Sequence, residues 1–191
     1  MKIEHLQESA FVIHDFLSEN ECRSYIKFSE RCGFHQASVQ HPRNGPLLME
    51  DIRNNDRVNI EDSKLAEQLF HKAKMVLPPQ LGGESLIGLN HRLRFYRYGA
   101  GQYFKWHRDG HVVRSDKERS LLTFLIYLND EFTGGETEFR WGKVATRLGT
   151  AVIFPHRLVH QGANVHSGIK YVLRTDVMYS AASIDSQNPE A

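Results

Sequence analysis

The spacing of apolar residues along the chain changes from helical in the first half to strand-like in the second. From Cys22 to Cys32, apolar and small residues recur three or four positions apart, as on the buried face of a helix. The preceding S-E-N-E stretch has the form of a capping box, in which Ser18 caps and Glu21 reaches back. Gly33 predicts the end of this helix.

A second apolar stripe predicts another helix over about residues 63–77, and the Pro-Pro pair at 78–79 stops it. Between the two helices, residues 34–60 are polar and have no clear period. We therefore expect an irregular connection there, with H-P-R-N-G-P at 41–46 as a loop.

From about residue 90, short β-rich runs alternate with glycine turns. This pattern is typical of an antiparallel sandwich or barrel, with the helices packed outside. We expect one structural domain with three parts: residues 1–88 pack on the core and carry substrate loops, 89–180 form the catalytic core, and 181–191 are a flexible tail. The expected strands lie in residues 91–98, 102–109, 120–129, 136–141, 150–155 and 171–179.

The composition is that of an ordinary globular protein, with 191 residues, 40% hydrophobic and 25% charged, which suits one domain. The net charge of +1 provides no strong field for nucleic acid or an acidic membrane. No apolar run reaches the roughly 18 residues of a membrane span, and charges interrupt the start of the chain, so we expect a cytoplasmic protein. Cys22 and Cys32 would lie about 15 Å apart on one helix, which predicts two reduced, packed thiols.

The stretch F-K-W-H-R-D-G places His107 and Asp109 two residues apart, which in a strand puts both on one face. Two histidines and one carboxylate on one face leave open positions on iron(II) for a co-substrate and dioxygen. The second histidine is His156 or His160. We favour His160 because Lys170 follows ten residues later, at the start of a strand, where a cation would bind a co-substrate carboxylate.

Three neighbours of this group have open interpretations. Tyr127 would supply a hydroxyl to the same carboxylate. His156 would be a surface residue or a support for the ligands, since Pro155 and the lack of His-Glu-x-x-His argue against a zinc helix. Arg174 shares a strand face with Lys170, so it would line the substrate side as a catalytic residue or pair with an acid such as Asp176.

The segment R-N-N-D-R at 53–57 has two interpretations. Polar loops carry function, so it would face the substrate. Alternatively, it is a solvated turn.

Several of these stretches together resemble the 2-oxoglutarate and iron(II)-dependent dioxygenases, in particular the prolyl 4-hydroxylase-like branch. The similarity covers about residues 88–180 and follows the order of that family. The segments that carry it are H-R-D at 107–109, Y-L-N-D…G-G-E-T-E-F at 127–139, T-A-V-I-F-P-H-R-L-V-H-Q-G at 150–162 and G-I-K-Y-V-L-R-T-D-V-M-Y at 168–179.

The resemblance implies a double-stranded β-helix, or jelly roll, with His107, Asp109 and His160 as iron ligands. It also implies that the distal carboxylate of 2-oxoglutarate meets Lys170 and Tyr127, and that Tyr98 lies beside this co-substrate. The implied reaction hydroxylates an unactivated C–H bond with release of succinate and carbon dioxide, and the implied cofactors are Fe(II), 2-oxoglutarate and ascorbate.

The sequence leaves the substrate open. A prolyl or peptidyl substrate is the first candidate, beside a free amino acid or another small molecule, and the near-neutral charge disfavours nucleic acid. Two other functions compete with the oxygenase: a non-catalytic jelly-roll metal-binding module, and a zinc hydrolase that uses the same three ligands. The oligomeric state does not follow from the sequence.

Overall fold

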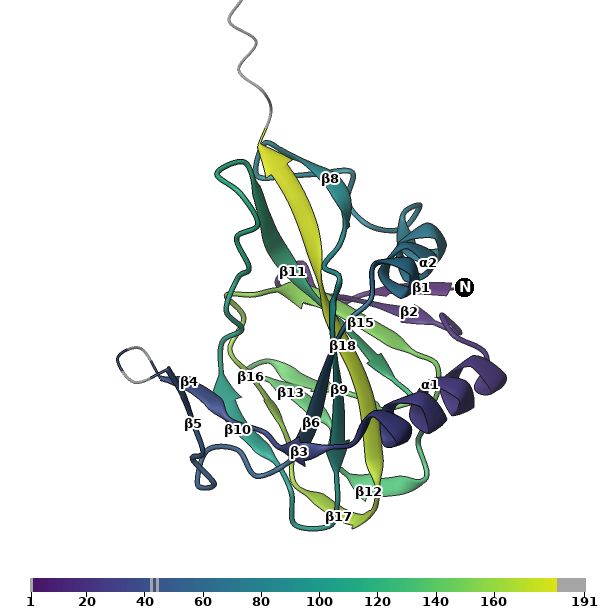
Figure 1. Ribbon diagram of the computed structural model, residues 1–191. Helices are drawn as coiled ribbons and strands as arrows, with labels where there is room; N and C mark the ends of the chain where they lie inside the picture. The colour runs from purple at the N-terminus through teal and green to yellow at the C-terminus, as the bar shows by residue number, and fades with distance from the viewer. Residues whose placement is uncertain (1, 42, 44, 182–191) are drawn as a thin grey trace, which may run out of the picture.

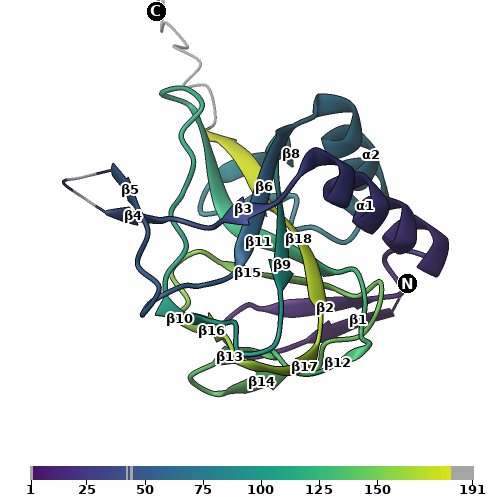
Figure 2. The ribbon, with the colours of Figure 1, turned by 60° about the horizontal axis from the view of Figure 1, so that its bottom comes forward.

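The computed structural model describes residues 2–41, 43 and 45–181. A large twisted sheet faces a smaller sheet, and both helices lie on the outer side of the large sheet (Figures 1 and 2). The molecule is mainly β, with a jelly-roll core and flanking helices, as the sequence predicts. The predicted tail, residues 181–191, lies outside the described residues except for Ala181.

The two helices are α1 (Glu19–Cys32) and α2 (Ser63–Ala73). The predicted capping box of α1 is confirmed, and Gly33 ends the helix with a φ of 80°. At α2, Asp62 is the N-cap and accepts a hydrogen bond from the Leu65 amide. In the part of the chain that the structure describes, no helix is both long enough and apolar enough to span a membrane.

The strands of the described residues form two larger sheets and two separate two-stranded pairs. The large sheet contains β1 (Lys2–His5), β2 (Phe11–His14), β3 (His35–Gln36), β6 (Asp56–Glu61), β7 (Gln80–Leu81), β8 (Glu84–Leu89), β9 (Arg92–Tyr98), β11 (Glu118–Tyr127), β15 (Ala151–Pro155) and β18 (Lys170–Ala181). The small sheet contains β10 (Phe104–His107), β13 (Thr137–Phe139), β14 (Gly142–Val144) and β16 (His160–Gly162). The pairs are β4 (Val39–His41) with β5 (Gly45–Leu47), and β12 (Phe132–Gly134) with β17 (Val165–Gly168).

The order of the large sheet is β1–β2–β15–β11–β18–β9–β6–β3, with β8 also paired to β18 and β7 paired to β8. The order of the small sheet is β10–β16–β13–β14. The N-terminal strands β2 and β6 pair directly with β15 and β9, so the first half of the chain extends the sheet of the second half. The proposed division at residue 88 stays a prediction.

Two apolar clusters lie on opposite faces of the large sheet. On the outer face, Phe124 and Leu173 pack with residues of α1 and α2. On the inner face, Tyr127 and Val172 pack with Phe139 of the small sheet. The alternation follows from the two-residue period of β11 and β18, whose successive side chains point to opposite faces. The site described below lies between the sheets, at the polar end of this inner face.

Three predictions about the N-terminal half are wrong. Residues 34–60 are not irregular throughout, because they contain β3, β4, β5 and most of β6. The second helix ends at Ala73 instead of residue 77, and turns precede Pro78, since the residue before a proline avoids the helical conformation. Cys22 is buried, but Cys32 is exposed at the end of α1, so only one of the two thiols is packed.

Candidate metal and co-substrate site

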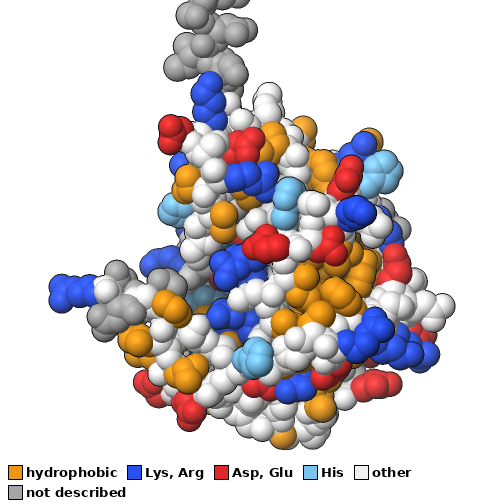
Figure 3. Space-filling view, in the orientation of Figure 1, with side chains coloured by type: hydrophobic (Ala, Val, Ile, Leu, Met, Phe, Trp, Pro, Cys, Tyr) orange, Lys and Arg blue, Asp and Glu red, His pale blue; other side chains and the backbone are white. Residues whose placement is uncertain are grey.

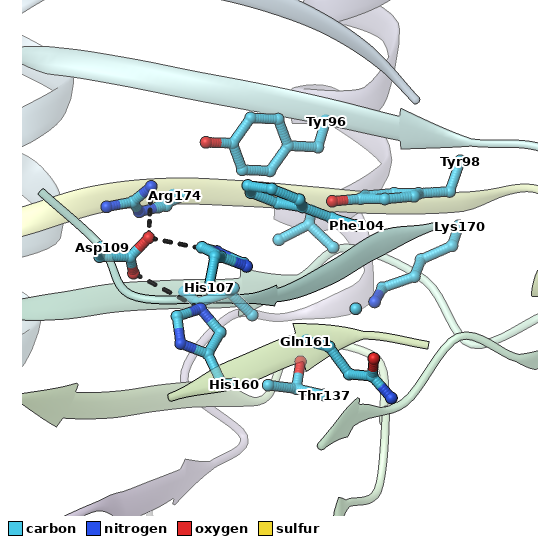
Figure 4. A pocket seen from close by; sticks show the side chains of 13 residues that line it. Tyr96, Tyr98, Phe104, His107, Asp109, Thr137, His160, Gln161, Lys170 and Arg174 are labelled. Atoms are coloured by element: carbon cyan, nitrogen blue, oxygen red, sulfur yellow. Dashed lines mark ion pairs between the residues drawn. The ribbon is translucent and has the colours of Figure 1, made fainter. Parts of the chain in front are cut away.

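Three side chains from two distant parts of the sequence meet where β10 and β16 pair. His107 ends β10, His160 begins β16, and the two are direct partners in the ladder. The His107 Nε2 atom lies 3.5 Å from Asp109 Oδ1, and His160 Nε2 lies 3.6 Å from Asp109 Oδ2. One ligand atom of each residue lies within 4.8 Å of those of the other two, and Figure 4 shows all three converging. This group can hold a single metal ion.

The backbone fixes the tautomer of both histidines. His107 Nδ1 lies 2.8 Å from the carbonyl oxygen of Lys105, and His160 Nδ1 lies 3.0 Å from that of Leu158. A carbonyl can only accept, so each Nδ1 carries the hydrogen and each Nε2 keeps its lone pair for a metal. Burial lowers the pKa of His160 to about 4, against the opposing attraction of Asp109, and keeps this ring neutral.

Asp109 is buried and held from two sides. Thr123 Oγ1 donates a hydrogen bond to Oδ2 over 2.6 Å, and Arg174 Nη1 lies 3.0 Å from Oδ1. Burial alone would raise the carboxyl pKa, but Arg174, His160 and His107 together hold it well below its usual value. Asp109 lies beyond the end of β10, so the expectation that both ligands share a strand face is wrong. The loop that follows β10 returns Asp109 to the site.

A chain of hydrogen bonds supports Asp109 from behind. Thr123 Oγ1 lies 2.9 Å from His156 Nδ1, and His156 Nε2 lies 2.8 Å from Ser120 Oγ, which accepts from the amide of Val112. Since Thr123 donates to Asp109, it accepts from His156 Nδ1–H, and His156 Nε2 accepts from Ser120. His156 is buried, so of its two predicted roles the surface one is wrong.

Lys170 stands alone at the opposite end of the same cavity. Its side chain is 3% exposed, and its Nζ donates to the carbonyl of Gly135 over 2.5 Å. Burial, only partly offset by Glu136, lowers the pKa of Lys170 to about 7. No carboxylate among the described residues pairs with this ammonium, which therefore suits an incoming anion.

The two tyrosines predicted near Lys170 occupy different positions. Tyr98 lines the cavity, with its ring 5.2 Å from Lys170 Nζ. Tyr127 is fully buried beside the cavity, and its hydroxyl donates to Thr137 Oγ1 over 2.7 Å. Thr137 lines the cavity in its place. A direct bond from Tyr127 to a co-substrate stays a prediction, and the structure adds Thr137 as the group between them.

Arg174 lies at the metal end of the cavity. Besides its bond to Asp109, its Nη2 lies 3.3 Å from Asp176 Oδ1, so the predicted pairing with Asp176 is present. Arg94 holds the other oxygen of Asp176 over 2.9 Å. These ion pairs fix Arg174 against both carboxylates, and its catalytic role stays a prediction.

The cavity joins the three ligands to Lys170 between the two sheets. Its walls carry the aromatic rings of Tyr96, Tyr98 and Phe104, and Phe104 stacks on His107 with ring centroids 3.5 Å apart. A divalent ion fits the end where two unprotonated Nε2 atoms and a carboxylate converge. The ammonium of Lys170 lines the same cavity and can bind a carboxylate there.

Some residues of this site, such as Thr123 and Thr137, are not predicted from the sequence. Thr123 shares the inner face of β11 with Tyr127, so the two-residue period of the strand could have revealed it. For the R-N-N-D-R segment, the sequence allowed two interpretations, a substrate-facing loop and a solvated turn. Arg53 is 3% exposed and Asn55 is fully buried, so the solvated-turn interpretation is wrong.

Comparisons with known proteins agree with this geometry. Residues 93–175 match the model of the 2OG-Fe(II) oxygenase superfamily. Prolyl 4-hydroxylase 1 of Arabidopsis thaliana is 28% identical over 84% of this chain. A prolyl-4-hydroxylase of Pseudomonas putida has a similar structure, with a TM-score of 0.66 and 18% identity over 90% of this chain and 93% of that chain.

Another similar structure is a prolyl hydroxylase of Trichoplax adhaerens, in complex with a hypoxia inducible factor peptide fragment. Its TM-score is 0.66 at 17% identity, over 90% of this chain and 84% of that chain. The chain spans 65% of the length of the Arabidopsis relative. At these identities the solved structures support the jelly-roll fold.

Proposed function

We propose that this chain, whose residues 93–175 match the model of the 2OG-Fe(II) oxygenase superfamily, is an Fe(II)- and 2-oxoglutarate-dependent hydroxylase. In this reaction an unactivated C–H bond of the substrate is hydroxylated while 2-oxoglutarate is converted to succinate and carbon dioxide. We propose His107, Asp109 and His160 as the metal ligands, and Lys170 as the anchor for the far carboxylate of 2-oxoglutarate.

One observation carries this proposal: a metal-type ligand group and a lone buried ammonium lie at the two ends of one cavity. A structural zinc site would have closed its coordination with a fourth ligand. A hydrolase or an empty module has no need for the charge of Lys170, because burying an unpaired cation costs free energy without a ligand anion. The pair of features matches a dicarboxylic co-substrate that spans from metal to ammonium.

The protein's own groups have distinct tasks in this proposal. The bound metal would supply oxygen activation. The carbonyls of Lys105 and Leu158 keep the histidine lone pairs available, and Thr123 together with Arg174 fixes the Asp109 carboxylate. The stacked aromatic rings and the small sheet exclude bulk water from the reacting atoms.

The substrate is the finer part of the proposal. The Arabidopsis relative is named as a prolyl 4-hydroxylase, and the Trichoplax structure holds a peptide, so we propose a peptide as the first substrate class to test. Ascorbate dependence stays a prediction.

The test is anaerobic addition of Fe(II) and then 2-oxoglutarate to the purified protein. We expect a weak visible charge-transfer band when both are present, and slow succinate release after oxygen is admitted. The Asp109→Ala variant should lose the band and reduce succinate release by more than about 1,000-fold, since a metal ligand is removed.

Ser180→Ala is the matched control, because Ser180 lies at the far end of β18 and bonds only the neighbouring Ala181 carbonyl through its side chain. It should behave like the wild type. A wild-type protein that binds zinc tightly but gives neither band nor succinate would contradict the oxygenase.

A further inference from the structure

The R-N-N-D-R segment is fastened to the strand that leads into the metal ligands. Arg53 forms a β-bridge with Phe104, and the Asn54 side chain accepts from the amide of Tyr103 over 2.8 Å. Asn55 Oδ1 accepts from Arg53 Nε over 2.7 Å. The two asparagines thus hold the backbone and the guanidinium of Arg53 in a fixed place beside the cavity.

Arg53 lies in a stack of rings that ends at the metal site. Its Cζ is 4.6 Å from the ring centroid of Tyr96 and 4.4 Å from that of Phe104, which in turn stacks on His107. Both aromatic rings line the cavity. The Nη2 atom of Arg53 is buried with no hydrogen-bond partner, so a charged donor is held close to the reacting centre and left unused.

Arg57, the other arginine of the segment, lies on the same side of the sheet as Tyr96. The two are direct partners in the β6–β9 ladder, and Arg57 Nη2 donates only to Ser38 Oγ, over 3.2 Å. Burial and the neighbouring cations Arg53, Arg92 and Arg94 lower the pKa of Arg57, despite an opposing contribution from Tyr96. Without an anion nearby, the repulsion between Arg57 and these neighbouring guanidiniums is not compensated.

The other arginines of this region differ from these two. Arg94, Arg97 and Arg174 each lie within 3.1 Å of at least one carboxylate oxygen. Among the residues that the structure describes, neither Arg53 nor Arg57 has a carboxylate within 4.0 Å. A guanidinium kept even partly from water without an anionic partner is costly, so these two side chains indicate a missing anion.

The proposed cofactors do not supply this anion. Fe(II) and 2-oxoglutarate carry opposite charges of equal size, so together they leave the local charge unchanged. The carboxylates of Asp109 and Asp176 are already paired with Arg174 and Arg94. In the space-filling view, Lys and Arg side chains gather beside the hollow next to the β4–β5 hairpin (Figure 3).

We propose that Arg53 and Arg57 recognise a carboxylate of the substrate, so that the hydroxylated C–H bond belongs to a molecule with an acidic group beside it. The inference rests on the proposed oxygenase function and names the substrate class for it. An acidic peptide side chain and a free acidic amino acid share this chemistry.

A carboxylate matches the donor geometry of these groups. A guanidinium presents parallel N–H donors that match the two oxygens of a carboxylate, and two arginines about one tyrosine offer a planar site. The Tyr96 hydroxyl, whose pKa Arg174, Arg53 and Arg94 lower to about 8 against its burial, is still mainly protonated at neutral pH and can donate as well. Arg53 lies 4.4 Å from the ring centroid of Phe104, which itself stacks on His107.

The test compares matched substrates in a succinate-release assay with saturating Fe(II) and 2-oxoglutarate. The probes are ten-residue peptides with one central proline and either Glu or Gln next to it, together with free glutamate and glutamine. We expect stimulation by the Glu peptides or by free glutamate, at least tenfold above their amide counterparts. The arm that responds identifies the source of the carboxylate.

Two variants test whether the preference for the acid depends on Arg57. Arg57→Gln, at a half-buried position, should raise the KM for the responding acid at least tenfold, with kcat changed less than threefold, and should abolish the preference for acid over amide. Arg92→Gln removes a charge from an exposed position on the neighbouring strand and should keep the wild-type KM. Binding of the fluorescein-labelled Glu peptide, followed by anisotropy with the apo protein, gives the same comparison without turnover.

Equal stimulation by acids and amides would overturn the inference, and so would an equal rise in KM for Arg57→Gln and Arg92→Gln. In both cases, succinate would still form and the proposed oxygenase function would stand. Absence of the charge-transfer band and of all succinate would instead remove the function itself. Arg53→Gln tests the buried arginine, and the Arg57 variant decides the result if that protein does not fold.

Discussion

The two faces of β11 and β18 alternate residue by residue, yet they obey different physical rules. The outer side chains, such as Phe124 and Leu173, are fully buried against the helices and contribute through area alone. The polar inner side chains, such as Thr123, Lys170 and Arg174, each bond specific polar partners. Burial is non-directional, whereas an inner-face contact depends on donor, acceptor and distance.

Within one strand, therefore, different residues contribute to stability and to the chemistry of the site. A change on the outer face should alter the free energy of unfolding and leave the site intact. A change to Lys170, which has no carboxylate partner among the described residues, should alter ligand binding and change the free energy of unfolding much less. Three measurements test this separation.

The largest effect is expected on the outer face, for Leu173→Ala. Leu173 is fully buried, so the truncation should lower the free energy of unfolding by about 3 kcal/mol. Urea denaturation measures this loss. Ile169→Ala is the control at an exposed position four residues away and should cost less than about 0.5 kcal/mol. A variant Leu173→Ala that folds but no longer binds 2-oxoglutarate would show that the faces are coupled.

Lys170→Met gives the inner-face counterpart. We expect 2-oxoglutarate to bind roughly 10- to 100-fold more weakly in calorimetric titrations, because its far carboxylate loses a charged hydrogen bond. The free energy of unfolding of the apo protein should change by less than about 1 kcal/mol, since removal of a buried unpaired charge offsets the lost bond to Gly135. If Lys170→Met strongly destabilised the protein but bound 2-oxoglutarate with unchanged affinity, Lys170 would be a structural residue and not the anchor of the co-substrate.

The last prediction concerns the pH dependence of 2-oxoglutarate binding. In the folded protein the pKa of Lys170 is lowered to about 7, so below pH 7 its ammonium is already charged and available to a dianion. Above pH 7 the side chain must first take up a proton, so the Kd for 2-oxoglutarate should rise by up to about tenfold per pH unit between 7 and 9. Lys170→Arg stays charged and should flatten the profile. A flat wild-type profile would contradict the lowered pKa.

The sequence predicts the parts of the fold that local chemistry determines. Ser18 and Gly33 bound α1 as predicted, because capping is a short-range property. The strand β6 was not predicted, since only Val58 and Ile60 are apolar in it. It is a strand because β9 offers it a ladder of backbone partners, which no local pattern reveals.

In the site, too, some features follow from the local sequence and others depend on tertiary contacts. The three metal-type ligands and Lys170 follow from residue types and order, and the structure brings them to one cavity. The position of Asp109 does not, because it depends on a loop, and that of Tyr127 does not, because its hydroxyl bonds Thr137 on another strand. In sequence, Arg53 is 51 residues from Phe104 and 43 residues from Tyr96. The stack that these three side chains form therefore arises from tertiary packing.

The hydrogen-bonded chain behind Asp109 has a direction, because each hydroxyl in it donates one way. From the amide of Val112 through Ser120, His156 and Thr123, every hydrogen points toward the metal end. Because the amide of Val112 can only donate and the carboxylate of Asp109 can only accept, no link between them can be reversed alone. Removal of one hydroxyl or of the imidazole would leave a donor or an acceptor of its neighbour without a partner, so the orientation of the Asp109 carboxylate depends on three side chains that do not line the cavity.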